Sequence, residues 1–355
     1  MNIQRPRPPR IDPTTPWHLR VLIVLALLVG WRPQRDAFYE NSAPRAATRG
    51  RALLALGAQD WLVLSYLVIL LVEVLVGDGP RRGPALRCVG ADLTIFAGTL
   101  WIVRGELVKH LLVRRLLYRV ALLVAIFGSF LQLQYILPAV SGPARDGVLH
   151  AIDVRLFGVE PSLAWDHLVR PATTEWYAFF YYGYFIIIAA HALPLLFFGK
   201  NAKTLNAFSF GFISLYCVGH VLYTFVPAYG PYAYLATEFQ HPLEGTFWWP
   251  LVKRTVESVD NGGRTDVFPS LHTAVPTFIA IFSFQHRRYN PFRYTWAPMA
   301  LFATQIVIAT MFLRWHYLID VCAGLVLAVV AANLARRAAR WDAQRVAAGG
   351  ADVFP

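Results

Sequence analysis

The chain has 355 residues, of which 56% are hydrophobic and 15% are charged, and its mean hydropathy is +0.44. A soluble domain carries about 25% charged residues, so this composition excludes an ordinary soluble protein and indicates an integral membrane protein. The net charge is +12, but the basic residues cluster between apolar runs. They form no basic face on a soluble module, which argues against nucleic-acid binding.

The N-terminal part of the chain contains a polar tail and three apolar runs. Residues 1–16 are rich in proline and arginine, which predicts a disordered tail. Residues 19–31 are apolar but shorter than the about 20 residues of a spanning helix. Three interpretations of this run remain open: a short or tilted span, a helix lying in the membrane interface, and a cleaved signal peptide. The runs at 57–77 and 88–104 predict spans, so we expect a transmembrane region over residues 17–116 with two to three helices.

Six further apolar runs predict a six-helix core over residues 117–334, followed by a cytoplasmic tail at 335–355. The runs cover residues 117–138, 174–198, 205–227, 270–285, 295–313 and 316–334. Two long connections, 139–173 and 228–269, separate some of them. The predicted fold class is therefore all-α, a polytopic integral membrane protein with this core and the N-terminal helices before it.

Clusters of lysine and arginine in short loops predict the orientation of the spans. Such clusters lie before residue 117, between 198 and 205, between 285 and 295, and after 334. The alternation of spans places all four clusters on one side, which we expect to be cytoplasmic. Arg81, Arg82 and Arg87 are the exception, because they fall on the opposite, non-cytoplasmic side together with both long connections.

Two short stretches carry a histidine at the entrance to an apolar run. They are Phe268-Pro269-Ser270-Leu271-His272-Thr273 and Arg314-Trp315-His316-Tyr317-Leu318-Ile319-Asp320. Pro269 suits the first position of a helix, where its missing N–H is not needed. Only one span separates the two stretches, so His272 and His316 should meet at one membrane depth. His316 and Asp320 are neighbours on one helix face at i, i+4.

This arrangement predicts a phosphate site. Helix N-termini have unpaired N–H groups and a partial positive charge, which favour an anion. One histidine can attack phosphorus while Asp320 holds its far nitrogen, and the other can protonate the leaving oxygen. Arg314 is a candidate bidentate phosphate ligand, or else an arginine of the membrane interface. Ser270 is expected either to donate to the phosphate or only to cap its helix.

Other interpretations of the motif residues and of two loop residues remain open. His316 and Asp320 can be an ordinary helix-start pair, although ionisable residues in spans are costly and usually functional. Two histidines and a carboxylate can also form a facial metal triad, but the helix N-termini and Arg314 favour an anion. We therefore expect no metal and no cofactor. Tyr229 can shape the mouth of a pocket or form an interfacial aromatic turn, and Arg264 is a candidate ligand for a phosphorylated headgroup.

The two histidine motifs resemble the second and third signature motifs of the type 2 phosphatidic acid phosphatase superfamily, over about residues 117–334. The Pro-Ser-Leu-His form and the stretch 153–161 are closer to the branch containing inositol phosphorylceramide synthase. The resemblance implies that His316 is the nucleophile forming a phosphohistidine, Asp320 its orienting carboxylate and His272 the acid for the leaving group. It also implies a metal-free site on the non-cytoplasmic face.

The sequence departs from the family pattern in two places. The first family motif, a lysine followed by Arg-Pro, should close the 205–227 span, but residues 226–231 contain no basic residue. The third motif usually carries an arginine where Thr310 stands. Phosphate binding is then expected to rely on Arg314 and on residues of the loops.

The expected activity is transfer of a phosphorylated headgroup from a phospholipid to the hydroxyl of another lipid, as in inositol phosphorylceramide synthase. With water as the acceptor, the chain would instead be a lipid phosphate phosphatase for phosphatidic acid or an isoprenoid phosphate. A non-catalytic lipid-binding membrane protein is the third reading, but it gives no reason for two histidines and a carboxylate to converge.

Overall fold

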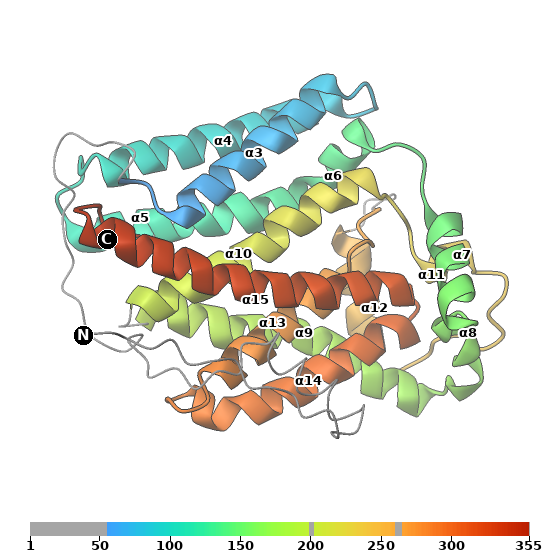
Figure 1. Ribbon diagram of the computed structural model, residues 1–355. Coiled ribbons are helices and arrows are strands. Elements are labelled where there is room, and N and C mark those ends of the chain that lie inside the picture. The colour runs from blue at the N-terminus through green and yellow to red at the C-terminus, as the bar shows by residue number, and fades with distance from the viewer. Residues whose placement is uncertain (1–54, 199–201, 260–264, 355) are drawn as a thin grey trace, which may run out of the picture.

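The computed structural model describes residues 55–198, 202–259 and 265–354, and helices dominate these ranges. The long helices are α3 (Ala58–Val76), α4 (Arg82–Arg104), α5 (Leu111–Leu123), α6 (Ser129–Val140), α9 (Pro171–Phe198), α10 (Ala202–Phe225), α13 (Leu271–Gln285), α14 (Phe292–Phe312) and α15 (Leu318–Ala347). They run roughly side by side, so that the bundle has two ends (Figure 1). The predicted tail at 1–16 and the uncertain helix at 19–31 lie outside the described residues.

Seven helical segments of the described chain are long and apolar enough to cross a membrane. One of them is continuous from residue 111 to 140, because a π-helical turn at Val124–Gly128 joins α5 to α6. α13 is apolar but has 15 residues, which corresponds to about 22 Å and is shorter than a typical span. The prediction of an all-α polytopic membrane protein is confirmed.

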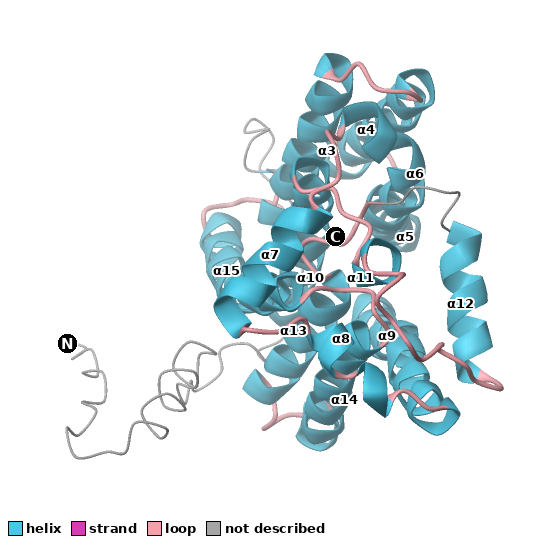
Figure 2. Ribbon diagram, turned by 90° about the vertical axis from the view of Figure 1, so that its right-hand side faces the viewer, coloured by secondary structure: helices cyan, strands magenta, loops and turns pink. Residues whose placement is uncertain are grey.

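Shorter helices cover one end of the bundle. They are α7 (Asp146–Phe157), α8 (Pro161–Ala164), the 3₁₀ turn Asp166–Leu168, α11 (Pro231–Tyr234) and α12 (Trp248–Val259). Figure 2 looks onto this end and shows α7, α8 and α11 lying across it, with α12 along one side of the bundle. All of them belong to the two long connections of the sequence. These connections therefore fold over the end of the bundle at which the two histidine motifs begin.

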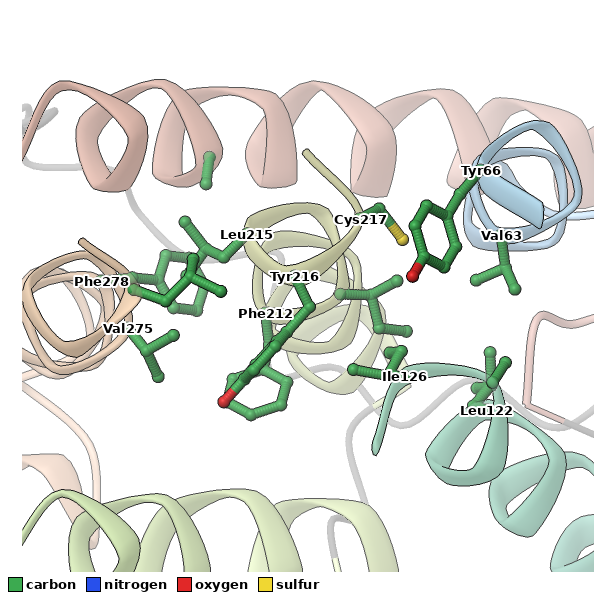
Figure 3. Close-up of a cluster of buried hydrophobic side chains, with 14 of the residues drawn as sticks. Val63, Tyr66, Leu122, Ile126, Phe212, Leu215, Tyr216, Cys217, Val275 and Phe278 are labelled. Atoms are coloured by element: carbon green, nitrogen blue, oxygen red, sulfur yellow. The ribbon is translucent and has the colours of Figure 1, made fainter. Parts of the chain in front are cut away.

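α10 is the central helix of the bundle and is largely buried. Figure 3 shows its side chains Phe212, Leu215, Tyr216 and Cys217 between residues of α3, α5 and the π-helical turn on one side and α13 on the other. A Cβ atom at Gly211 would lie 2.4 Å from the ring of Phe278. Glycine is required there because α13 packs closely against α10, as small residues allow in membrane bundles.

α15 continues beyond the predicted span. It begins at Leu318, after His316, and runs to Ala347, through most of the segment that the sequence predicts as a tail. The residues that follow fold back onto the bundle, where the buried Phe354 packs edge-on against Tyr118 with ring centroids 5.5 Å apart. Residues up to 354 are therefore part of the folded protein.

A buried ion pair joins the N-terminal helices to the C-terminal residues. Arg104 of α4 donates to Asp60 of α3 at 2.6 Å, and both side chains are almost fully buried. Tyr118 of α5 donates to the same carboxylate. Arg104 also donates to the carbonyls of Asp352 and Val353 at 2.8 and 3.0 Å. This network connects α3, α4, α5 and the chain end at the opposite end of the bundle from the histidine motifs.

Two of the arginines that do not fit the charge rule have a local role. Arg82 donates to the carbonyls of Val74 and Leu75, which the end of α3 leaves unpaired. Arg81 donates to the carbonyl of Gln134 at 3.0 Å. That carbonyl has no helical partner because residue 138 is a proline without an N–H. These arginines satisfy helix carbonyls, which explains their presence on the side opposite to the other basic clusters.

We predict that Asp60→Asn destabilises the protein strongly. Removing one charge of a buried pair leaves the other uncompensated and costs about 3–5 kcal/mol. The matched control is Glu257→Gln, which breaks the exposed pair between Lys253 and Glu257 and should cost about 0–1 kcal/mol. The measurement is the unfolding free energy of the purified protein in detergent. Equal losses of unfolding free energy in the two variants would show that the buried pair stabilises the protein no more than the exposed pair.

Candidate active site

The two motif histidines lie next to each other. His272 is the second residue of α13 and His316 lies in the turn between α14 and α15, and their ring centroids are 6.2 Å apart. Tyr181 stacks on the His272 ring at 4.5 Å with an interplanar angle of 12°, and Tyr184 lies at 4.3 Å. The predicted proximity of the two histidines is confirmed.

A close contact between the starts of α13 and α15 positions the two histidines. The backbone N–H of Ser270 donates to the carbonyl of Asp320 at 3.1 Å. A Cβ atom at Gly324 would lie 2.5 Å from the carbonyl oxygen of Ser270. Only a residue without a side chain lets the first turns of the two helices approach in this way.

His316 is buried beside Asp320. Its Nδ1 lies 3.6 Å from Asp320 Oδ2, which is longer than a hydrogen bond, and the imidazole is hydrogen-bonded to the backbone of Val267. Burial lowers the pKa of His316 to about 4, although Asp266 and the Val267 contact oppose this shift. The ring is therefore neutral at neutral pH, which is the form that can act as a nucleophile.

Carboxylates occupy the N–H groups at the start of α15. Asp153 of α7 accepts from the backbone N–H groups of Leu318 and Ile319 at 2.6 and 2.8 Å. Asp320 accepts from the N–H of Tyr317 at 2.9 Å. The expectation that this helix start offers unpaired N–H groups to a phosphate is therefore wrong. The physical reason is that buried backbone donors need partners, and the protein supplies them itself.

Asp146 of α7 fixes a second part of the site. It accepts from the backbone N–H of Gly230 at 2.8 Å and from that of Tyr229, and it accepts from the Tyr317 hydroxyl at 3.0 Å. Neither Asp146 nor Asp153 was predicted to have a role in the site. Their spacing of seven residues, two helical turns, places both on one face of a helix and is the signal that identifies them.

Two of the predicted phosphate-binding residues have other partners. Ser270 Oγ accepts from the N–H of Thr273 at 3.2 Å, so it caps α13. Arg314 donates to Asp166 at 2.8 Å and to the carbonyl of His241. Arg314 is not among the residues that line the cavity next to the histidines. The structure thus does not bring its side chain together with His272 and His316. Arg264 lies outside the described residues.

An apolar cavity of about 510 Å³ extends from the two histidines into the bundle. This volume is within the usual range for small-molecule sites. Its wall consists mostly of aromatic and aliphatic side chains from the segment 111–140, α9, α10 and α12. Tyr229 is also one of the lining residues. Among the described lining residues, Asp266 is the acidic one and none is lysine or arginine. Within the described ranges, no three His, Cys, Asp or Glu side chains are arranged to hold a metal ion.

Comparison with known proteins gives one match. A family model described as the PAP2 superfamily matches residues 148–334, which is more than half of the chain. The match begins in α7 and includes both histidine motifs. No curated protein and no solved structure matches the chain.

The buried Glu160 predicts a pH dependence of stability. Glu160 caps α8 by accepting from the N–H and the hydroxyl of Ser162. Burial, with a smaller contribution from Asp153, raises the pKa of Glu160 from its ordinary 4.5 to about 7. A carboxyl group with a raised pKa in the folded state stabilises the protein at low pH. This stabilisation is lost as the pH rises from about 4.5 through about 7.

We therefore predict that Glu160→Gln flattens the fall of the unfolding free energy between pH 5 and 7. One such group contributes a slope of at most about 1.4 kcal/mol per pH unit. Thermal or denaturant unfolding of detergent-solubilised protein across this range measures the slope. Glu238→Gln, at an exposed position, is the control and should keep the wild-type slope. The same slope in Glu160→Gln as in the wild type would refute the assignment.

Proposed function

Because the chain belongs to the PAP2 superfamily, a superfamily of phosphatases and phosphotransferases, we propose that it transfers a phosphorylated headgroup between membrane lipids. The observation that carries this proposal is the pair of adjacent histidines, His272 and His316, at an apolar cavity within a bundle of membrane-spanning helices. The donor is a phospholipid, the acceptor is the hydroxyl of a second lipid, and no cofactor takes part.

The proposed reaction has two steps. In the first, a nitrogen of neutral His316 bonds to phosphorus, the bond between phosphorus and the lipid oxygen breaks, and His272 gives a proton to that oxygen. Burial and the neighbouring His316 lower the pKa of His272 in the empty site, so this mechanism requires His272 to take up its proton when the anionic phosphate binds. In the second, the acceptor hydroxyl attacks the phosphohistidine. The phosphorus–nitrogen bond breaks and the hydroxyl proton goes to His272. Asp320, 3.6 Å from His316 Nδ1, stabilises the positive charge that the ring carries while it is bonded to phosphorus.

The cavity wall supports a lipid acceptor. Aromatic and aliphatic side chains make up most of the lining, so a lipid alcohol can lie in the same apolar space as the donor. The Pro-Ser-Leu-His form of residues 269–272 supports the same choice, because it resembles the branch of inositol phosphorylceramide synthase. A phosphatase that uses water is the alternative outcome of the experiments below.

The charge distribution supports a site on the non-cytoplasmic face. Arg287 and Arg288 follow α13, and Arg336 and Arg337 lie in the second half of α15. The end of α13 and the second half of α15 lie far from the helix starts beside the two histidines (Figure 1). Since basic loop residues mark the cytoplasmic side, the histidines lie at the other membrane surface.

We predict that His316→Ala abolishes the phosphorylated enzyme and lowers kcat by on the order of 10⁴-fold. His272→Ala should slow turnover mainly for lipids with a poor leaving group, because only these need the proton, and an activated aryl phosphate should partly rescue it. The assay combines purified protein with phospholipids, with and without a lipid alcohol, and traps the phosphoenzyme. His167→Ala, at an exposed histidine, is the control.

The results of these assays distinguish a transferase, a phosphatase and a metal-dependent enzyme. A new phospholipid formed only with the lipid alcohol present supports transfer, whereas release of free phosphate in its absence indicates a phosphatase. Full activity in His316→Ala would end the phosphohistidine mechanism. Loss of activity with a chelator and recovery with a divalent ion would support metal catalysis instead.

The orientation has its own test. In a variant with the native cysteines replaced by alanine, Glu238→Cys should react in intact cells with an impermeant thiol reagent, because it lies in the exposed loop before α12. Arg288→Cys, in the exposed turn after α13, should react only after lysis. The reverse pattern would show that the site faces the cytoplasm.

A further inference from the structure

The cavity beside the two histidines reaches the surface of the bundle at two places. Tyr229 lines it at the end of the bundle and is 41% exposed. Leu131 and Phe185 line it on the side of the bundle and are 54% and 45% exposed. Leu131 belongs to the segment 111–140 and Phe185 to α9, both of which are long and apolar enough to cross a membrane. The second opening therefore faces the hydrocarbon interior of the bilayer.

This side opening exists because α9 and the segment 111–140 do not pack closely against each other along their described residues. The lining face of α9 extends from Tyr181, which stacks on His272, to Leu193. These 12 steps correspond to a rise of about 18 Å along the helix. The cavity thus offers an acyl chain a continuous apolar path from the histidines into the bilayer.

α12 lies along the side of the bundle at which the cavity opens (Figure 2). Its inner face places Val252, Thr255 and Val256 in the cavity wall. Its outer face carries Lys253 and Glu257, whose exposed side chains pair with each other. A helix with one apolar face and one charged face is suited to lie between hydrocarbon and water. α12 therefore borders the side opening at the level of the lipid headgroups.

One carboxylate holds the start of α12 on α9. Glu175, near the start of α9, accepts hydrogen bonds from three consecutive backbone N–H groups at 3.1, 2.8 and 3.1 Å, those of Phe247, Trp248 and Trp249. The first turn of a helix leaves such donors without a helical partner. A Cβ atom at Gly245 would lie 2.1 Å from Glu175 Oε1, so glycine lets the preceding loop come this close. Glu175 thus fixes the position of α12 relative to the cavity.

We propose that a bilayer phospholipid inserts one acyl chain through the opening between α9 and the segment 111–140, and that Glu175 is a positioning residue that holds α12 at the edge of this opening. The proposal rests on the proposed function, since it takes the two histidines as the place of reaction. It adds the route of the donor lipid, whose acyl chain comes from the hydrocarbon side while its headgroup lies toward Tyr229. A water-soluble substrate needs only the opening at Tyr229.

The first test blocks the side opening chemically. In a variant with the native cysteines replaced by alanine, Phe185→Cys is modified with N-(1-pyrenyl)maleimide, which is bulky and enters membranes. The matched control is Ile186→Cys, because Ile186 is the next residue of α9 and is 52% exposed but does not line the cavity. Two substrates are compared before and after modification. One is dioleoyl phosphatidylinositol mixed with dioleoyl phosphatidic acid in liposomes that contain the protein, and the other is p-nitrophenyl phosphate in solution.

Modification of Phe185→Cys should lower the release of dioleoylglycerol about tenfold, equivalent to a barrier about 1.4 kcal/mol higher, and should leave the release of p-nitrophenol unchanged. Modified Ile186→Cys should retain both activities. Both lipids release dioleoylglycerol when phosphorus is transferred to His316, so the result does not depend on whether water or a lipid alcohol is the acceptor.

The second test removes the anchor of α12. Glu175→Ala deletes the acceptor of three N–H groups and should lower kcat/KM for the liposomal lipids about tenfold, the effect of losing one hydrogen bond to a charged group. Hydrolysis of p-nitrophenyl phosphate should stay unchanged. Glu175→Gln keeps an acceptor oxygen and should retain most of the lipid activity. Glu244→Ala, which removes an exposed carboxylate from the loop before α12, is the control and should match the wild type.

The possible results are distinct. An unchanged lipid rate after modification of Phe185→Cys overturns the proposed entrance, and so does an equal loss with both substrates or a loss in modified Ile186→Cys. A wild-type lipid rate in Glu175→Ala overturns the role of Glu175. Product release that survives His316→Ala, or its absence with both substrates in the wild type, refutes the proposed function itself. Selective loss of the lipid reaction supports the entrance and the function together.

Discussion

The carboxylate of Asp153 bound to the first N–H groups of α15 is the interaction on which the site depends. A backbone donor without a partner is costly inside a membrane protein, and α15 starts in a buried position next to His316. Asp153 satisfies two of these donors, and Asp146 from the same helix fixes Tyr317 and the turn at Gly230. α7 thus fixes the backbone next to His316, the proposed nucleophile, although α7 lies outside the predicted spans.

The helices and the proximity of the two histidines could be predicted from the sequence, because both follow from the lengths and the number of the apolar runs. Apolar runs have the length of a span, and one span between the motifs places His272 and His316 at the same end. The sequence did not predict the partners of the polar groups. Whether an N–H at residue 318 is free depends on which loop residue folds over it, and no local pattern shows this. Arg314 has a φ of 66°, and its guanidinium pairs with Asp166, which is 148 residues away in sequence.

The two ends of the bundle are stabilised in different ways. At the end that carries the chain terminus, the ion pair of Asp60 and Arg104 is closed by Tyr118 and by backbone carbonyls. A buried pair of this kind requires that its remaining hydrogen-bonding groups be satisfied. At the other end, Asp146 and Asp153 bind backbone N–H groups, and Asp166 binds the N–H groups of Gln240 and His241 as well as Arg314. The first arrangement fixes the helices to each other, and the second fixes the loops to the start of α15.

The carboxylates near His316 suit its proposed role as the nucleophile. When a neutral imidazole bonds to phosphorus, its ring acquires a positive charge, and in a buried site that charge needs a nearby anion. Asp320 lies 3.6 Å from His316 Nδ1 and Asp266 acts on the same ring, so two carboxylates can stabilise the phosphohistidine. A basic first motif would neutralise the substrate, whereas in the mechanism proposed for this chain the carboxylates stabilise the intermediate. In this proposal, stabilisation of the phosphohistidine compensates for the missing lysine and arginine of the first motif.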